Sequence, residues 1–187
     1  MDSTTLRSRP LVLLLAATLL MSLTLGTAFI VQHRSHTQRG VAVEPPANPM
    51  SDDETMKQVV DSARQFVDSG RLKTVHGTYL LMSCRTENEP PYQGTAYIDF
   101  DIPPVTTAPD YLPDFARAMI KRGWKAGLDP NQHPGGEIMT KNGVTALFYR
   151  NADISGRGVL QIYSECRNVT DHRMDPTGFV DISDQLR

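Results

Sequence analysis

Residues 95–102 read TAYIDFDI, an unbroken alternation of apolar and polar side chains. A period of two is typical of a β-strand with one buried and one solvated face. Asp99 and Asp101 then fall on the solvated face, where the alternation accounts for both carboxylates without any chemistry. The opposite face is apolar and needs a second layer to cover it, and it carries Ala96, Ile98, Phe100 and Ile102.

Two amphipathic segments can supply that layer, one on each side of the quoted strand in the sequence. Residues 51–70 open with SDDE, the pattern of a helix capping box, and their apolar residues recur every three or four positions. Gly70 is placed to end this helix. Residues 110–123 show the same period after Asp110, the expected N-cap. Trp124, the single tryptophan of the chain, follows directly and is expected in the core.

Further extended runs complete a sheet. Residues 78–84 are apolar and aromatic and precede the quoted strand. Residues 138–149 hold Asn142-Gly143 between two such runs, which predicts a hairpin with a type I′ turn because both turn positions need positive φ. Residues 159–166 form the last run. The order α-β-β-α-β-β-β therefore predicts an α+β domain with a mainly antiparallel sheet of about five strands and both helices on one face.

A separate segment near the N-terminus has the composition of a membrane helix. Residues 11–31 contain no charged side chain, and at 1.5 Å of rise per residue this length roughly matches the ~30 Å hydrocarbon core of a bilayer. The alternative is a cleaved signal peptide, whose apolar region is usually about 7–15 residues long. Residues 26–28, Gly-Thr-Ala, would then supply the cleavage site. The length favours a retained transmembrane helix that acts as a signal anchor.

This helix divides the chain into four predicted parts. They are a cytoplasmic N-terminus at 1–10, the transmembrane helix at 11–31, a proline-rich stalk at 32–50 and an extracytoplasmic α+β domain at 51–187. Two arginines flank the helix on each side, so the positive-inside rule does not decide its orientation. The outward orientation of the domain rests instead on the cysteines, because a disulfide needs an oxidising compartment.

The charge of the chain argues against nucleic acid as a partner. The formal net charge is −2, and the segment before Gly40 holds four arginines and a single aspartate, so the remaining residues are more acidic than this total. Binding to a phosphate backbone requires a basic surface. The five histidines are scattered and show no ligand spacing with the cysteines, so neither a metal nor another cofactor is predicted.

The two cysteines, Cys84 and Cys166, each end an expected strand. Alternation places each cysteine on the same side of its strand as apolar residues, so both thiols are expected to face the core. Parallel neighbouring strands would bring the two Cα atoms within the roughly 4.4–6.8 Å that a disulfide needs. We therefore predict a Cys84–Cys166 disulfide, since zinc would need further ligands and a redox motif would need Cys-x-x-Cys.

One loop and one turn are candidates for recognition. Residues 129–138, DPNQHPGGEI, concentrate prolines and glycines around His133. Loops on a rigid sheet often carry binding residues, so His133 and Arg157, in the turn ISGRG, are the predicted recognition residues; the alternative is a stiff surface turn. No catalytic residue is predicted, because Ser155 in that turn lacks the Gly-x-Ser-x-Gly pattern and has no histidine near it in sequence.

Several phrases of the domain resemble those of small exported proteins of actinobacteria, mycobacteria in particular. They include GTYLLMSC, PPYQG, RGW, HPGG, GVTALFYRN and LQIYSECRN, and the resemblance spans roughly residues 51–180. These proteins include membrane proteins and lipoproteins of unassigned function, so the resemblance implies an extracytoplasmic location with an intramolecular disulfide, and no catalytic residue or ligand. A lipoprotein would carry its lipidated cysteine directly after the apolar segment, whereas the first cysteine here is Cys84.

Three functional hypotheses follow. The first is a non-enzymatic cell-envelope protein, held in the cell membrane by one transmembrane helix, whose domain binds an envelope protein or acts as an accessory subunit. An interaction domain of this kind would show a filled core and an exposed apolar patch. The second is a module for a small ligand such as a lipid or a cell-wall fragment, which would show a deep apolar cavity between sheet and helices. The third is a hydrolase of unrecognised type, which would bring His133 or His172 together with a serine and a carboxylate.

Overall fold

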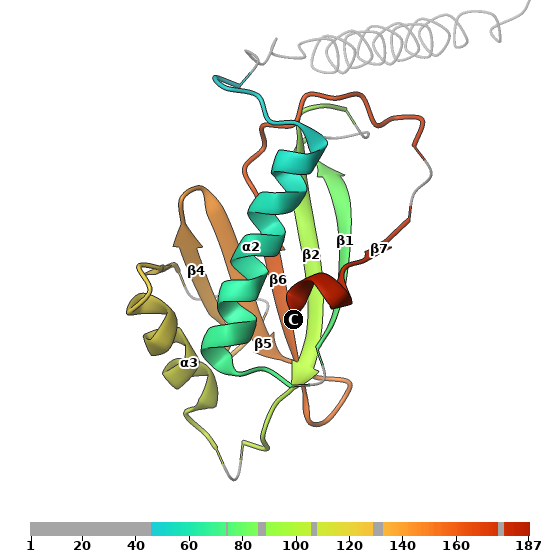
Figure 1. Ribbon diagram of the computed structural model, residues 1–187. Coiled ribbons are helices and arrows are strands. Elements are labelled where there is room, and N and C mark those ends of the chain that lie inside the picture. Colours follow the sequence, from blue (N-terminus) through green and yellow to red (C-terminus); the bar gives the residue numbers. More distant parts are fainter. Residues whose placement is uncertain (1–45, 74, 86–88, 106–107, 129–132, 176–177) are drawn as a thin grey trace, which may run out of the picture. The chain divides into compact units, whose positions relative to one another are not determined.

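The computed structural model describes residues 46–187, apart from 74, 86–88, 106–107, 129–132 and 176–177 (Figure 1). The predicted N-terminus, the transmembrane helix and residues 32–45 of the stalk therefore lie outside the described residues. Among the helices that are described, none combines the length and apolarity needed to cross a bilayer.

The domain is a single antiparallel sheet with its helices on one face (Figure 1). The helices are α2 (Asp52–Gly70), α3 (Tyr111–Ile120) and a short 3-10 helix, η1 (Ser183–Leu186). The strands are β1 (His76–Ser83), β2 (Tyr92–Asp101), β3 (Lys125–Ala126), β4 (Glu137–Lys141), β5 (Val144–Arg150), β6 (Arg157–Tyr163) and β7 (Val180–Asp181). They lie in the order β3-β4-β5-β6-β2-β1-β7, and every neighbouring pair is antiparallel. The predicted α+β class is confirmed.

The predicted number of strands, about five, was wrong because the sheet has seven. The two additional strands, β3 and β7, form the two edges of the sheet and are each two residues long. Two residues are too few to show an alternation, and all four side chains are exposed, so no apolar pattern marks them. Their positions are set by the neighbouring strands, which no local pattern reports.

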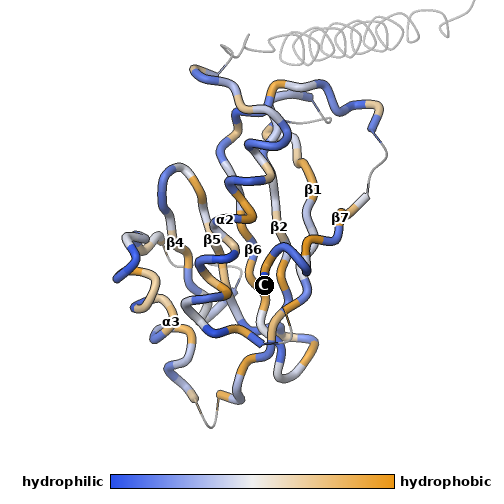
Figure 2. Tube along the Cα trace, viewed as in Figure 1, coloured by the Kyte–Doolittle hydropathy of each residue, from blue (hydrophilic) through white to orange (hydrophobic). Residues whose placement is uncertain are grey.

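The core lies between the sheet and the helices and is filled by aromatic side chains. Phe66 of α2 stands at its centre, with its ring centroid 4.7 Å from Trp124 and 5.7 Å from both Phe115 and Phe148. Trp124 is 2% exposed, as predicted, and the alternating apolar residues of β2 are all buried. Much of α2 is hydrophilic where it faces the viewer in Figure 2, because its apolar residues turn toward the sheet.

The start of α2 is as predicted and its end is not. The backbone N–H of Ser51 donates to Glu54 Oε2 at 2.8 Å, and the N–H of Glu54 donates to Ser51 Oγ at 3.3 Å, which completes the capping box. Gly70 lies inside the helix, and the left-handed residue that ends it is Arg71, with φ of 47°. A side chain at Gly70 would come within 2.8 Å of the Phe115 ring, so this glycine permits the close packing of the two helices.

The predicted β4–β5 hairpin is confirmed, whereas the limits of α3 are shorter than predicted. Asn142 and Gly143 both have positive φ, 49° and 77°, as a type I′ turn requires. Asp110 is the N-cap of α3, but its side chain makes no capping hydrogen bond, and the helix ends at Ile120 rather than at the predicted limit, residue 123.

Candidate functional site

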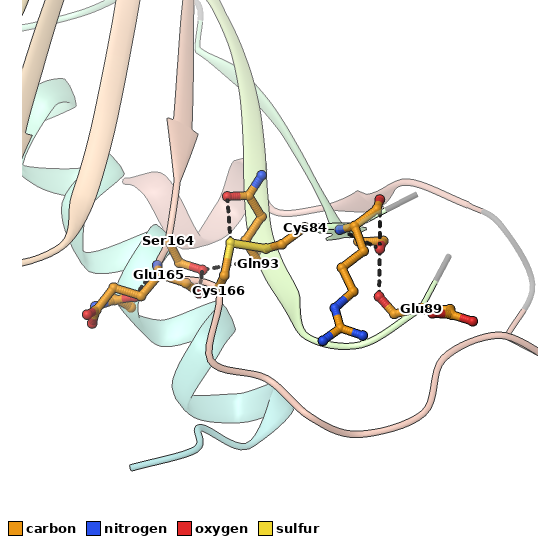
Figure 3. Close-up of a disulfide and its surroundings, with 10 residues drawn as sticks. Cys84, Glu89, Gln93, Ser164, Glu165 and Cys166 are labelled. Atoms are coloured by element: carbon orange, nitrogen blue, oxygen red, sulfur yellow. Dashed lines mark hydrogen bonds between the residues drawn. A yellow bond between two sulfur atoms is a disulfide. The ribbon is translucent and has the colours of Figure 1, made fainter. Parts of the chain in front are cut away.

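A disulfide joins Cys84 and Cys166 across a strand that lies between them (Figure 3). Both β1 and β6 pair antiparallel with β2, so they run parallel to each other as predicted, but they are not neighbours. Strands two places apart are roughly 9–10 Å distant, whereas the two Cα atoms are 6.1 Å apart. The cysteines achieve this because they lie beyond the last residues of β1 and β6, where Cys166 Sγ is 3.7 Å from Gln93 Oε1 of β2.

The prediction that both cysteines face the core was wrong. Cys84 is half-buried and Cys166 is exposed. In β1 the residues that pack with the core are Tyr79 and Leu81, since Tyr79 lies opposite Ala96 in the sheet. The alternation could not decide the face of β1, because apolar residues occupy both of its sides from Tyr79 to Met82.

The opposite face of the sheet, called the open face here, carries side chains that no described helix covers. Three tyrosines from adjacent strands stand on it: Tyr97 of β2, Tyr163 of β6 and Tyr149 of β5. Gln161 joins two of them, donating from Nε2 to Tyr149 Oη at 3.0 Å and accepting from Tyr163 Oη at 2.6 Å. We call these four residues the tyrosine cluster. The half-buried apolar residues around it are Leu80, Ile138, Leu147 and Val159.

Two phenols of the tyrosine cluster, those of Tyr149 and Tyr163, have raised pKa values. Burial, with nearby Tyr97 and Tyr149, raises the pKa of Tyr163 to about 12. Burial also raises the pKa of Tyr149, helped by Tyr97 and the Asp99 carboxylate. These two hydroxyls therefore stay protonated at neutral pH and can donate or accept hydrogen bonds. Such chemistry suits recognition better than proton transfer.

The structure places His133 against the tyrosine cluster and Arg157 farther along β6, in contact with Asp101. The His133 ring stacks on Tyr149, with centroids 3.6 Å apart and planes 15° from parallel. Arg157 forms an ion pair with Asp101, with 2.6 Å between the nitrogen and the carboxylate oxygen. In β6, Arg157 lies two positions before Val159, the residue opposite Tyr149. Their role in recognition stays a prediction. The tyrosines were missed, although each occupies a polar position of its strand's alternation, a place where a large aromatic side chain is a usable signal.

A second surface, the edge groove, lies between β1 and the C-terminal segment that leads into β7. We call residues 169–175 and 178–179 of that segment the strap (Figure 1). The groove has a volume of about 700 Å³. Its lining includes apolar and aromatic residues of β1, β2 and the strap together with two arginines, namely Leu81, Met82, Tyr92, Phe179, Arg85 and Arg173.

A histidine fastens the start of the strap to α2. The Nδ1 atom of His172 is 2.6 Å from Asp175 Oδ2, and its Nε2 atom is 3.1 Å from Asp52 Oδ1. Burial alone would lower the pKa of His172, but the hydrogen bond to Asp175 and the Asp52 carboxylate outweigh it and raise the pKa. Burial alone would raise the pKa of Asp52, and hydrogen bonds from Asn168 and His172 lower it instead.

The contacts of His172 and His133 argue against the hydrolase hypothesis. Both ring nitrogens of His172 contact carboxylates, which leaves neither to accept a proton from a hydroxyl nucleophile. His133 stacks on a tyrosine ring. Within the described residues, the arrangement of histidine, serine and carboxylate that a hydrolase would need around His172 is therefore not formed. The described residues also contain no group of three metal-ligating side chains.

These features define a disulfide-linked α+β domain. The short sequence motifs noted above resemble those of small exported proteins of actinobacteria. The chain belongs to the LppJ family: the family model described as "Putative lipoprotein LppJ" matches residues 51–185. Proteins of that name from two strains of Mycobacterium tuberculosis and from Mycobacterium bovis are each 35% identical to it over 147 residues. The alignments cover 78% of this chain and 77% of each relative. No solved structure matches the chain.

Proposed function

We propose that this protein is a non-enzymatic component of the cell envelope whose domain binds another envelope protein through the open face. The observation that supports the proposal best is the tyrosine cluster, a half-buried array of aromatic and hydrogen-bonding side chains on the sheet face that no described helix covers. Tyrosine is enriched at protein interfaces, where it supplies a large contact area together with a polar tip. Apolar residues around the cluster would add to the buried area.

The envelope location is supported by the family and by the disulfide. The relatives are named as lipoproteins, and a disulfide persists in oxidising compartments outside the cytoplasm. Both cysteines lie in the disulfide, so neither is free to carry a lipid. Membrane attachment is therefore proposed through residues 11–31, with the domain on the outer side.

The filled core favours protein binding over the carrier hypothesis. A lipid carrier was expected to hold its cargo between sheet and helices, where three of the largest side chains, Phe66, Phe100 and Phe148, are fully buried. Their rings occupy the space that a cargo would need.

Site-specific photo-crosslinking in living cells tests the proposal. A photoreactive phenylalanine at Tyr149 in the full chain should form a covalent adduct with one discrete envelope protein, identified by mass spectrometry. Tyr163→Ala, which changes a neighbouring residue of the tyrosine cluster, should reduce the yield of that adduct several-fold. The matched control places the same crosslinker at Lys57, an exposed position of α2 on the helical side of the domain. Equal adducts from both positions, or none from Tyr149, would contradict the proposal.

A further inference from the structure

Among the described residues, one edge of β1 has a partner strand along only part of its length. The Cys84 N–H donates to Pro91 O beyond β2, while Gly77 O accepts from Ile182 N beyond β7. Backbone groups of even-numbered residues thus face β2 and those of odd-numbered residues face the other side. On that other side β7 pairs only with Thr78 and Tyr79.

Leu81 and Ser83 therefore direct their backbone N–H and C=O groups into the edge groove. The part of the chain that the structure describes gives neither residue a strand partner there, since its pairing with β7 is limited to Thr78 and Tyr79. An exposed strand edge is a template for another strand, because it offers donors and acceptors at the spacing of an extended backbone.

We propose that the edge groove binds an extended polypeptide segment of another protein as an added strand on β1. Leu80 borders both surfaces, but the backbone edge of β1 is a different set of groups from the tyrosine cluster, so either proposal can fail without the other. The groove volume of about 700 Å³ falls within the ~300–1,000 Å³ usual for ligand sites. Side chains of the added strand would alternate between its two faces, one toward Leu80 and Met82 and the other toward Leu81.

The charges of the groove indicate an acidic residue in the bound segment. Arg173 is already engaged, with two nitrogens on the Asp171 carboxylate. His172 is held between Asp52 and Asp175. Arg85 lines the groove and is exposed, and none of the described carboxylates pairs with it. It is therefore the cation available to a carboxylate at the end of the groove beyond Ser83.

A phage-displayed library of random heptapeptides, panned against the full chain in phosphatidylcholine nanodiscs, tests the proposal. The matched variant is Leu81→Pro, which removes the one N–H of Leu81 that points into the groove and leaves the hydrogen bonds to β2 intact, as an edge strand tolerates. Wild-type protein should enrich peptides with alternating apolar residues and an acidic residue near one end. Leu81→Pro should bind the same peptides about tenfold more weakly.

Two further measurements separate this result from a loss of folding. Leu81→Val keeps the N–H and should retain affinity, and Arg85→Glu should weaken binding about fivefold through charge alone. In amide hydrogen exchange, a synthetic copy of the enriched peptide should protect Leu81 and Ser83, and a copy with N-methylated backbone should not.

Four outcomes would overturn the proposal. Enriched peptides that bind Leu81→Pro as well as wild type would place the contact elsewhere. Failure to enrich any peptide over Leu81→Pro would show that the groove has no affinity for extended chains. Protection of both amides in the free monomer would show that the strap itself closes on β1. Protection that appears only with rising protein concentration would show that a second copy of the chain is the occupant.

Discussion

Asp52, the first residue of α2, and His172, at the start of the strap, are 120 positions apart in sequence and 3.1 Å apart in space. Asn168 donates a further hydrogen bond to the same Asp52 oxygen at 2.7 Å. The carboxylate therefore serves two roles, since an acidic side chain in the first turn also stabilises the helix dipole. One aspartate thus links the stability of α2 to the position of the strap that borders the edge groove.

This contact predicts a pH dependence of stability. The folded-state pKa of His172 lies above its ordinary value of 6.5, so its contribution is complete below that pH and is lost as the pH rises through the folded-state value. The pKa of Asp52 lies below 3.8, so its contribution is lost only in strong acid. His172→Gln should therefore reduce the free energy of unfolding near pH 5.5 and change it little near pH 9, as measured by urea denaturation. An equal loss at both pH values would contradict the assignment.

The disulfide should make a large contribution to stability. Its removal typically costs about 2–5 kcal/mol in a small exported domain, and the loop that it closes spans 82 positions. Cys84→Ser should lower the free energy of unfolding by about that amount and leave Cys166 as one reactive thiol per chain. Thiol labelling followed by mass spectrometry checks this directly. Two labelled thiols in wild-type protein after export would show that the bond does not form.

Phe66 should be among the most costly core residues to truncate. It is fully buried and contacts three other aromatic rings, and Phe→Ala changes at such sites cost about 3–5 kcal/mol. Phe66→Ala should also shift the fluorescence of Trp124 to longer wavelength, because water would reach the indole 4.7 Å from the deleted ring. Phe66→Leu is the control that keeps most of the apolar volume. A similar loss for both variants would show that aromatic geometry, rather than volume, matters at this site.

The capping box predicts a difference between two serines of the same helix region. Ser51→Ala removes the side-chain cap of α2 and should destabilise the domain by about 1 kcal/mol. Ser69 does not cap the helix, because its hydroxyl donates to the Gln65 carbonyl within the helix. Ser69→Ala should therefore change the free energy of unfolding by less than about 0.5 kcal/mol. Thermal denaturation of both variants, followed by circular dichroism, makes the comparison.

Sequence periodicity predicted the elements of this fold better than their arrangement. The capping box at Ser51, the alternation of β2 and the Asn142-Gly143 turn are local signals, and each is present in the structure. The face of β1 was predicted wrongly because apolar residues lie on both sides of that strand. Only pairing with Ala96 of β2 decides which side is buried, and that contact is not encoded within β1.

The candidate site shows the same division between local and distant contacts. His133 was recognised from the composition of its loop, whereas its stacking on Tyr149 depends on how the loop returns to the sheet. The tyrosine cluster draws residues from β2, β5 and β6, which become neighbours only through the order of strands. The pairing of Cys84 with Cys166 could be predicted because the chain holds two cysteines, but the strand between them could not.

The disulfide also determines how the domain responds to mechanical load. A pull applied between the two ends of the chain passes directly from Cys84 to Cys166 through the covalent bond. The chain between them, which contains β2 through β6, is thereby removed from the path of the force. Only α2 and β1 on one side, and the strap, β7 and η1 on the other, can be drawn out. Under tension, the elements outside the disulfide loop would unfold, and the strands from β2 to β6 would stay folded.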